Sequence, residues 1–284
     1  MNSVAGLNWN NAGYAALSGP LLTLYNRVDA IFQNWARNIG ADDQRFPNLI
    51  ALADLKPIAY LRSFPHLATF ACSPGTDHET LTRFASVNQT ASEVRCEANW
   101  EASHQILTPA ACYHFYPRLA NQELKHDCYL TTVCSCHRRE REYLPLERQW
   151  CFNMRELVCI GNPEAVDKFI NESQQRVDWL VQQLGLETHW QIATDPFFDP
   201  LQDPKAVAQQ IEPVKRELVL TDGLAIASIN RHRGFFGECY GITRDGDSAH
   251  SACVAFGLER WLCALLRHFG EDPKNWPALE VRLL

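Results

Sequence analysis

The order of periodic segments along the chain constrains its fold more than any other feature. Apolar residues recur at helical spacing in residues 20–38 and 163–184, and again in residues 252–268 near the C-terminus. Short runs that alternate or concentrate β-forming residues lie between turn signals, at residues 129–136, 151–160, 187–192, 216–221 and 224–231. Helices before, between and after strands predict an α+β domain, in which helices cover a mostly antiparallel sheet.

Local signals mark the ends of the predicted helices. Pro20 suits the first turn of the first helix. Asn162 and Pro163 suit the cap and first turn of the second helix, and Gly185 suits its end. The third helix is expected to stop near Gly270.

Composition sets the size and broad class of the protein. The 284 residues, 46% of them hydrophobic, are enough to bury a full core. Because repeats, low-complexity tracts and charged linkers are lacking, we expect one domain over residues 1–284, with a helical segment over about residues 1–44. The net charge of −7 gives no overall attraction for a nucleic-acid backbone. No apolar run reaches the roughly 18 residues of a membrane span, and the N-terminus lacks a secretory signal, so we expect a cytoplasmic protein.

The cysteines must be weighed one by one, because 11 is an odd number and a reducing compartment keeps most of them as free thiols. Cys134 and Cys136 are one residue apart and Cys128 is nearby, but no Cys-x-x-Cys pair recurs at zinc-ribbon spacing. We expect these three cysteines to pack in the core or in a strand.

A basic and acidic pair marks the turn between two of the predicted strands. Arg138 and Glu140 are two residues apart, so on a strand their side chains project from the same face. There Arg138 can bind a phosphate bidentately and Glu140 can accept from an adenine amino group. The alternative is an exposed, salt-bridged hairpin of little energetic value.

A second candidate for phosphate binding lies near the C-terminus. Gly257, Glu259 and Arg260 fall in an apolar segment that we expect to open as a helix at Cys253, with the arginine one turn in. A helix start with a small residue and an arginine suits the terminal phosphates of a nucleotide. The tetrapeptide alone is a weak signal.

The Arg-x-Glu hairpin followed about 120 residues later by Gly-x-Glu-Arg resembles the catalytic core of class II aminoacyl-tRNA synthetases. Arg138 and Glu140 match the second signature of that core, and Gly257 to Arg260 match its third. Further segments together resemble the amino acid:[carrier protein] ligases, truncated relatives of the atypical, zinc-containing seryl-tRNA synthetases. They are Thr108–Tyr113, Asn153–Gly161, Asp195–Phe198, Ser228–His232 and Ala249–Gly257.

This resemblance implies a zinc ion held by two cysteines and one glutamate, at Cys112, Glu156 and Cys253. Such a ligand set leaves a fourth tetrahedral position open, as a catalytic zinc site requires, and that position suits the α-amino group of an amino acid. Without the resemblance, the three residues would be taken as a buried cysteine, a strand glutamate and a cysteine at a helix start.

The resemblance also implies the reaction, an ATP-dependent activation of an amino acid as its adenylate. Arg138 would meet the α-phosphate and Arg260 the γ-phosphate, Phe152 would stack on adenine, and Mg²⁺ is expected alongside. A strand aromatic such as Phe152 can equally belong to the core. The adenylate would then pass to the phosphopantetheine thiol of a small acidic carrier protein. Related enzymes activate glycine or alanine, so a small amino acid is expected.

Partners follow from the same comparison. The segment Arg45-Phe46-Pro47 resembles the first class II signature, which lies at a subunit interface, so a homodimer is expected. Only about 45 residues precede this segment, so we expect no tRNA-binding domain and no tRNA substrate. The outer face of residues 163–184, with Lys168 and Arg176, is a candidate surface for an acidic carrier protein.

Some positions depart from the family pattern or leave the assignment open. Those expected to flank the amino-acid pocket and the phosphate site are Asn153, Arg231, Gly234, Glu238 and Cys239. Candidate Mg²⁺ ligands are Asp127, Glu217 and Glu238. Two rival functions remain, a catalytically silent paralogue that binds zinc as a regulatory subunit, and aminoacylation of tRNA.

Overall fold

A computed structural model of the chain describes residues 4–88 and 100–279. A twisted seven-stranded sheet forms its centre, in the order β10-β11-β12-β15-β9-β8-β3. Its neighbouring strands pair antiparallel except β3 and β8, which run parallel. The strands are β3 (Asp42–Asp43), β8 (Cys128–His137), β9 (Cys151–Gly161), β10 (Thr188–Ala193), β11 (Lys215–Leu220), β12 (Ala225–Arg233) and β15 (His250–Gly257).

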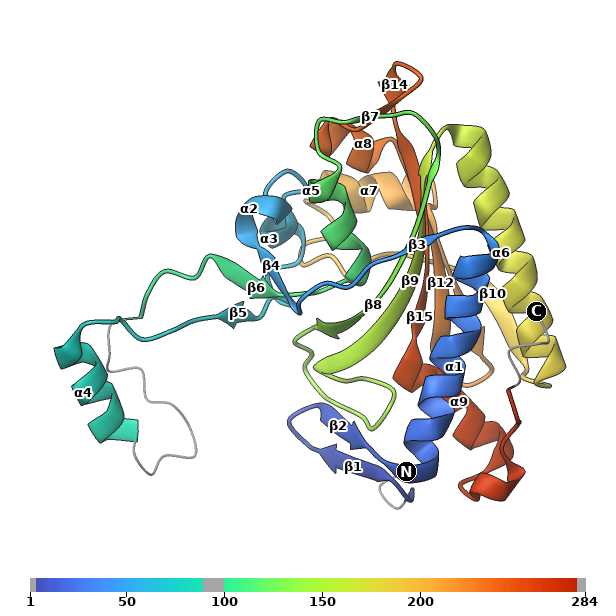
Figure 1. Cartoon of the computed structure of the whole chain (residues 1–284), viewed down its shortest axis with the longest axis horizontal. Helices are drawn as coiled ribbons and strands as arrows, with labels where there is room; N and C mark the ends of the chain where they lie inside the picture. The colour runs from blue at the N-terminus through green and yellow to red at the C-terminus, as the bar shows by residue number, and fades with distance from the viewer. Residues whose placement is uncertain (1–3, 89–99, 280–284) are drawn as a thin grey trace.

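Three long helices cover one face of this sheet (Figure 1). They are α1 (Gly19–Asn38), α6 (Pro163–Gln183) and α9 (Leu258–Phe269). Their apolar stripes pack with side chains of β9, β12 and β15 into one large core. The predicted start and end of α6 are confirmed. The Asn162 side chain accepts a hydrogen bond from the Ala165 amide at 2.9 Å, and Gly185 has a left-handed φ of 66° just past the helix.

Shorter elements lie on the other face and at the edges. A second core there joins the sheet to the short helices. The helical elements are α2 (Leu52–Leu55), α3 (Tyr60–Ser63), η1 (Ala111–His114), α5 (Phe115–Arg118), α7 (Pro204–Ile211), α8 (Phe235–Tyr240), η2 (Pro273–Asn275) and α4 (His78–Asn88), which projects away from the body in Figure 1. The minor strands are β1 (Leu7–Asn10), β2 (Tyr14–Leu17), β4 (Leu49–Ala51), β5 (Phe70–Ala71), β6 (Gln105–Leu107), β7 (Glu123–Leu124), β13 (Thr243–Arg244) and β14 (Asp247–Ser248).

The predicted α+β architecture, an antiparallel sheet flanked by helices, is confirmed. The prediction of one helix over residues 252–268 is wrong in its first part, since residues 250–257 form β15 and the helix begins at Leu258. Both faces of β15 are covered, so its side chains form a continuous apolar run that periodicity alone does not separate from a buried helix. Cys253 therefore lies within a strand. The hairpin β1–β2 also precedes α1, in a segment predicted to be helical.

The predicted packing of the three cysteines in the core or in a strand is confirmed, since all three lie in β8, where Cys134 and Cys136 are buried and Cys128 is half-buried. All ten cysteines among the described residues are free thiols; Cys96 lies outside the described residues. None of the helices in the described part of the chain combines the length and apolarity needed to cross a bilayer.

A buried arginine fastens α1 and β3 to the sheet. The Arg155 side chain is fully buried, and its Nε and Nη2 atoms donate to the Asp29 carboxylate of α1 at 2.7 and 2.9 Å. Its Nη1 atom donates to Asp43 of β3 and to Thr131 of β8, at 3.3 Å each. A guanidinium that reaches three elements in this way fixes their relative positions behind the pocket described below.

Replacing Arg155 by Met should therefore destabilise the fold. Loss of one partner of a buried ion pair costs about 3 to 5 kcal/mol, and we expect about 2 to 3 kcal/mol because both aspartates reach solvent. Lys168→Met, which breaks an exposed pair with Glu172, should cost less than about 0.5 kcal/mol. Urea unfolding of both variants measures the loss in the free energy of unfolding. Equal losses would show that the contacts of Arg155 do not hold α1 and β3 to the sheet.

Candidate active site

A cavity of about 430 Å³ opens on the sheet face opposite the three long helices. Alternation along the central strands explains its lining. Along β9, Met154 and Glu156 face the cavity, whereas Leu157 and Cys159 belong to the core under the helices. On β15, Cys253 and Ala255 line the cavity in the same way.

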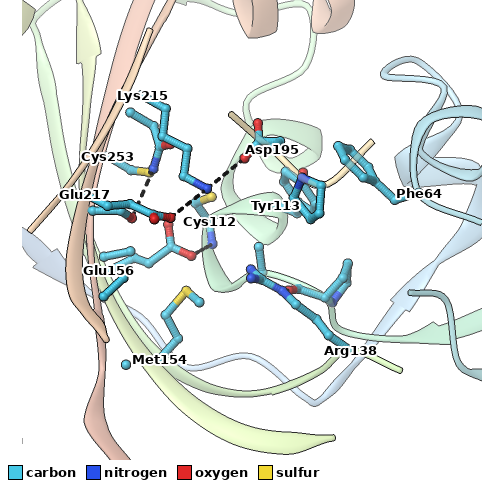
Figure 2. A pocket seen from close by; sticks show the side chains of 18 of the residues that line it. Phe64, Cys112, Tyr113, Arg138, Met154, Glu156, Asp195, Lys215, Glu217 and Cys253 are labelled. Carbon is cyan, nitrogen blue, oxygen red and sulfur yellow. Dashed lines mark hydrogen bonds and ion pairs between the residues drawn. The ribbon is translucent and has the colours of Figure 1, made fainter. Parts of the chain in front are cut away.

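Three side chains of types that can hold a metal ion meet in this cavity (Figure 2). Donor atoms of Cys112, Glu156 and Cys253 all lie within 4.8 Å of one another, and all three residues are buried. They come from η1, β9 and β15. In the β9–β15 register Cys253 opposes Val158, so Glu156 is its diagonal neighbour on the same face. The structure thus brings together the three residues that the resemblance implied, from positions up to 141 residues apart.

The electrostatics of this cluster suit a bound dication. The hydrogen bond with Cys253, burial and the Glu156 carboxylate raise the pKa of the Cys112 thiol well above its usual value. The Cys112 amide donates to Glu156 Oε1 at 3.2 Å, which fixes the carboxylate beside the sulfurs. Three acidic ligands this close repel one another when ionised, and a metal ion removes that cost. Two thiolates and one carboxylate fit zinc, with its fourth position open.

Two further side chains contact the sulfur of Cys253. Asn230 Nδ2 lies 3.4 Å from it and His232 Nε2 lies 3.6 Å from it. Burial lowers the pKa of His232 to about 4, so its ring is neutral at physiological pH. The sequence offered a signal for both, since Asn230 and His232 alternate on one strand within a segment that carries the family resemblance.

Arg138 and Glu140 occupy different positions from those predicted. Strand β8 ends at His137, so they follow the strand rather than project from one of its faces. Arg138 lines the cavity, where its Nε donates to Pro109 O at 2.9 Å and its guanidinium lies 5.4 Å from the centre of the Phe152 ring. Glu140 also lines the cavity, 4.0 Å from Arg148.

Arg260 lines the cavity from the first turn of α9. Its Nε donates to Glu147 O at 2.8 Å and its Nη1 donates to Ala225 O at 3.1 Å, so the main chain sets the orientation of the guanidinium. Burial and the nearby positive charge of Arg138 lower the pKa of Arg260. Arg138, Phe152 and Arg260 therefore line one cavity together with the cluster of Cys112, Glu156 and Cys253.

A half-buried charged triad that the sequence did not predict lies beside the cluster (Figure 2). Lys215 Nζ lies 3.0 Å from Asp195 and 3.1 Å from Glu217, and Gln209 donates to Asp195 at 3.0 Å. Of the three predicted Mg²⁺ ligands, only Glu217 lines the cavity. Asp127 instead pairs with Arg244 at 3.2 Å, away from it.

Tyr60 was also missed. It lines the cavity from α3, is only 3% exposed, and its hydroxyl has no hydrogen-bond partner among the described residues. Burial raises the pKa of Tyr60 to about 12, so the hydroxyl stays protonated and can donate to a ligand. Its α3 position gave no periodic signal in the sequence.

Most of the departures from the family pattern do not face the cavity. Arg231 lines it and also pairs with Asp167. Asn153 belongs to a second, separate cavity and bonds to Ser135 and to Glu259. The remaining departures, Gly234, Glu238 and Cys239, lie in or next to α8 and are not part of the lining. Of the five, only Arg231 lines the cavity, whereas Asn153 and Gly234 each lie between two residues that do and so flank it as expected.

The candidate carrier surface on α6 lies on the face of the sheet opposite the cavity. Helix α6 packs on the face formed by residues such as Val254 and Phe256, whereas the cavity opens on the opposite face. Lys168 pairs with Glu172 at 3.8 Å on the exposed side of α6. Arg231, which lines the cavity, pairs with Asp167 of α6, and no contact among the described residues tests α6 as a docking surface, so this surface stays a prediction.

Comparison with known proteins gives consistent matches. The family described as tRNA synthetase class II core domain (G, H, P, S and T) matches residues 95–269. Amino acid--[acyl-carrier-protein] ligase 1 of Bradyrhizobium diazoefficiens is 34% identical over 255 residues, which cover 85% of this chain and 76% of that protein. Ligase 2 of the same organism is 32% identical and matches 85% of this chain and 74% of its own length.

Synthetases that act on tRNA match over a smaller share of their length. A type-2 serine--tRNA ligase of Methanococcus maripaludis is 25% identical over 92% of this chain, which spans only 54% of that enzyme. The seryl-tRNA synthetase of Methanopyrus kandleri, solved with a tRNA, superposes with a TM-score of 0.82 at 21% identity, over 97% of this chain and 57% of its own. This structural likeness concerns the fold.

The buried carboxyl of Glu259 should titrate near neutral pH. Burial raises the pKa of Glu259 to about 7, although the hydrogen bonds from Asn153 act in the opposite direction and lower it. Between its ordinary pKa of 4.5 and about 7, the folded chain holds a proton there that the unfolded chain has lost. The contribution of Glu259 to stability is therefore fully present below pH 4.5 and is lost as the pH rises through 7.

Carboxyl ¹³C NMR of glutamate-labelled protein measures this titration, and the resonance is identified by its absence from Glu259→Gln. A midpoint below pH 5 would show that the hydrogen bonds from Asn153 outweigh burial.

Proposed function

We propose that this chain, which belongs to the class II tRNA synthetase core family and within it to the amino acid--[acyl-carrier-protein] ligases, activates an amino acid with ATP and transfers it to a carrier-protein thiol. Membership of this family makes the protein an enzyme of the ligase class. One observation supports the proposal most strongly. The cluster of Cys112, Glu156 and Cys253 shares one cavity with Arg138 and Arg260.

The amino acid would be held at the cluster. We propose that Cys112, Glu156 and Cys253 hold a zinc ion, because their donor atoms, burial and mutual repulsion suit this metal. Bound there, zinc would supply an open coordination position for the α-amino group of the substrate. The cavity walls would then direct the carboxylate of the amino acid toward the nucleotide.

The first half-reaction is a displacement at phosphorus. The carboxylate oxygen attacks the α-phosphorus of ATP, an acyl phosphate bond forms, and the bond to pyrophosphate breaks. Arg138 would stabilise charge at the α-phosphate and Arg260 at the γ-phosphate, while Phe152 and Glu140 would hold the adenine. Glu217 is our candidate ligand for Mg²⁺, because it alone among the predicted ligands lines the cavity.

The second half-reaction transfers the aminoacyl group. The phosphopantetheine thiol of the carrier attacks the adenylate carbonyl, a thioester forms, and AMP leaves with the bonding electrons while the thiol proton passes to solvent. We propose that the carrier approaches the open side of the cavity, because its thiol must reach the adenylate there.

We further propose a small amino acid, glycine or alanine, as the substrate. The half-buried charges of Lys215, Asp195 and Glu217 lie beside the cluster, and a large apolar side chain placed against them would remove their remaining water without compensating bonds. A small side chain leaves the triad intact.

A cytoplasmic homodimer is the remaining part of the proposal. A reducing compartment keeps cysteines as free thiols, which is the state of the ten described cysteines. The homodimer is proposed from the segment that resembles the first class II signature, where Phe46 stacks on His114 at 4.7 Å and Arg45 donates to Val133 O at 3.4 Å.

The net charge of −7 disfavours tRNA as the acceptor.

Exchange of labelled pyrophosphate into ATP tests the activation step. Across a panel of amino acids, we expect exchange with glycine or alanine well above that with leucine or phenylalanine. Preference for a large apolar amino acid would overturn the proposed substrate, and exchange with none would favour the silent paralogue.

Metal analysis tests the zinc site. Purified protein should contain about one zinc per chain, and Cys253→Ala should lose it because the ligand set falls to two. Cys159→Ala is a matched control, since Cys159 is also buried but lies on the helix-covered face of β9, away from the cavity. Undiminished zinc in Cys253→Ala would refute the site.

Replacing Arg260 by Ala should slow pyrophosphate exchange by about 10² to 10³-fold, the usual effect of losing a group that stabilises charge in the transition state, while zinc stays bound. Arg216→Ala removes an exposed arginine of β11 outside the cavity and should leave exchange unchanged. If the two variants behave alike, Arg260 does not contact the phosphates.

A further inference from the structure

The sulfur of Cys253 lies within reach of two side-chain N–H groups from the neighbouring strand. Asn230 is the direct cross-strand partner of Cys253 in the β12–β15 register, and its Nδ2 atom donates to the sulfur at 3.4 Å. His232 Nε2 lies 3.6 Å from the same sulfur. The two ligand sulfurs are therefore unequal, because the structure records no such N–H bond to Cys112 from the described residues.

A break in the strand pairing places His232 at this position. The β12–β15 register shifts between Arg231 and Arg233, which oppose Ala252 and Ser251. Arg233 adopts a φ of 53°, the left-handed region that non-glycine residues rarely enter. Irregularities of this kind redirect side chains near active sites and persist only where the surroundings enforce them.

Hydroxyl groups on the far side of the ring are placed to donate to Nδ1, which is the arrangement that keeps the proton on Nε2. His232 Nδ1 lies 3.1 Å from Ser251 Oγ and 3.2 Å from the Tyr116 hydroxyl, which itself donates to Ser251 Oγ at 3.5 Å. A chain in which Tyr116 donates to Ser251 and Ser251 donates to Nδ1 leaves the hydrogen on Nε2. A thiolate only accepts, so this tautomer is the one that bonds to Cys253.

His232 is not itself part of the ligand cluster. Among the described residues, the donor atoms that all lie within 4.8 Å of one another belong only to Cys112, Glu156 and Cys253. The imidazole reaches the cluster through the sulfur of Cys253 alone.

We propose that His232 and Asn230 are positioning residues for the metal site, which donate N–H bonds to the Cys253 thiolate and so orient it and disperse its charge. This inference rests on the proposed zinc site. Two thiolates and one carboxylate exceed the charge of a dication by one, and neutral donors reduce the cost of that excess. Partners that orient metal ligands in this way commonly change metal affinity by about 10 to 100-fold.

Cobalt(II) binding to the metal-free 284-residue chain tests the proposal. Affinity is measured by competition with a chelator, and the sulfur-to-cobalt charge-transfer absorption reports on the thiolates. His232→Phe keeps a ring of similar size but no donor, and should weaken binding by about 10 to 100-fold and shift the charge-transfer band. His232→Gln restores an N–H donor and should recover part of both. The control His189→Phe removes an exposed histidine of β10 and should change neither.

A double variant keeps the test valid if His232→Phe does not fold. Tyr116→Phe with Ser251→Ala retains His232 but removes the hydroxyls that hold its tautomer, and should weaken cobalt binding to a smaller extent. Wild-type affinity and spectrum in both variants, or equal losses in His232→Phe and His232→Gln, would overturn the inference while leaving the zinc site standing. Failure of the wild-type protein to bind cobalt or zinc would overturn the zinc site as well.

Discussion

The antiparallel pairing of β9 with β15 is the constraint on which the rest of the structure depends. Its register makes Glu156 and Cys253 diagonal neighbours on one face, and it turns the intervening residues, such as Leu157 and Val254, into the core beneath the helices. A slip of one residue would exchange the two faces, bury the carboxylate under α1 and α6, and expose the apolar core to the cavity. The site and the stability of the fold are therefore set by the same hydrogen bonds.

Charge is arranged around this sheet in two separate layers. On the helix side, Arg155 is compensated by Asp29 and Asp43 and serves to hold α1 and β3. On the cavity side, the acidic cluster has no buried cation bonded to it among the described residues, and its thiol pKa is correspondingly raised. An excess of ligands of like charge, close to two arginines, suits a protein that assembles a metal ion, an amino acid and a polyphosphate in one place.

Sequence patterns predicted the elements well wherever periodicity and turn signals agreed, as in α1, α6 and strands β8 to β12. They failed for β15, because a strand buried on both faces has no alternation to distinguish it from a helix. The candidate metal ligands Cys112, Glu156 and Cys253 carried no local signal, since their proximity arises from strand register and tertiary packing, and only the resemblance pointed to them. Lys215 and Tyr60 were missed for the same reason: each reaches the cavity through tertiary packing that no spacing rule describes.

The most direct test of the account is the product of the complete reaction. The 284-residue chain is incubated with ATP, with glycine or alanine, and with a phosphopantetheinylated carrier protein, and the carrier is analysed by intact mass. A parallel reaction contains total tRNA in place of the carrier. We expect the mass of the carrier to rise by one aminoacyl group, which is bound as a thioester and which hydroxylamine removes. The added mass should be absent when the carrier lacks phosphopantetheine. Charging of tRNA with no adduct on the carrier would contradict the account.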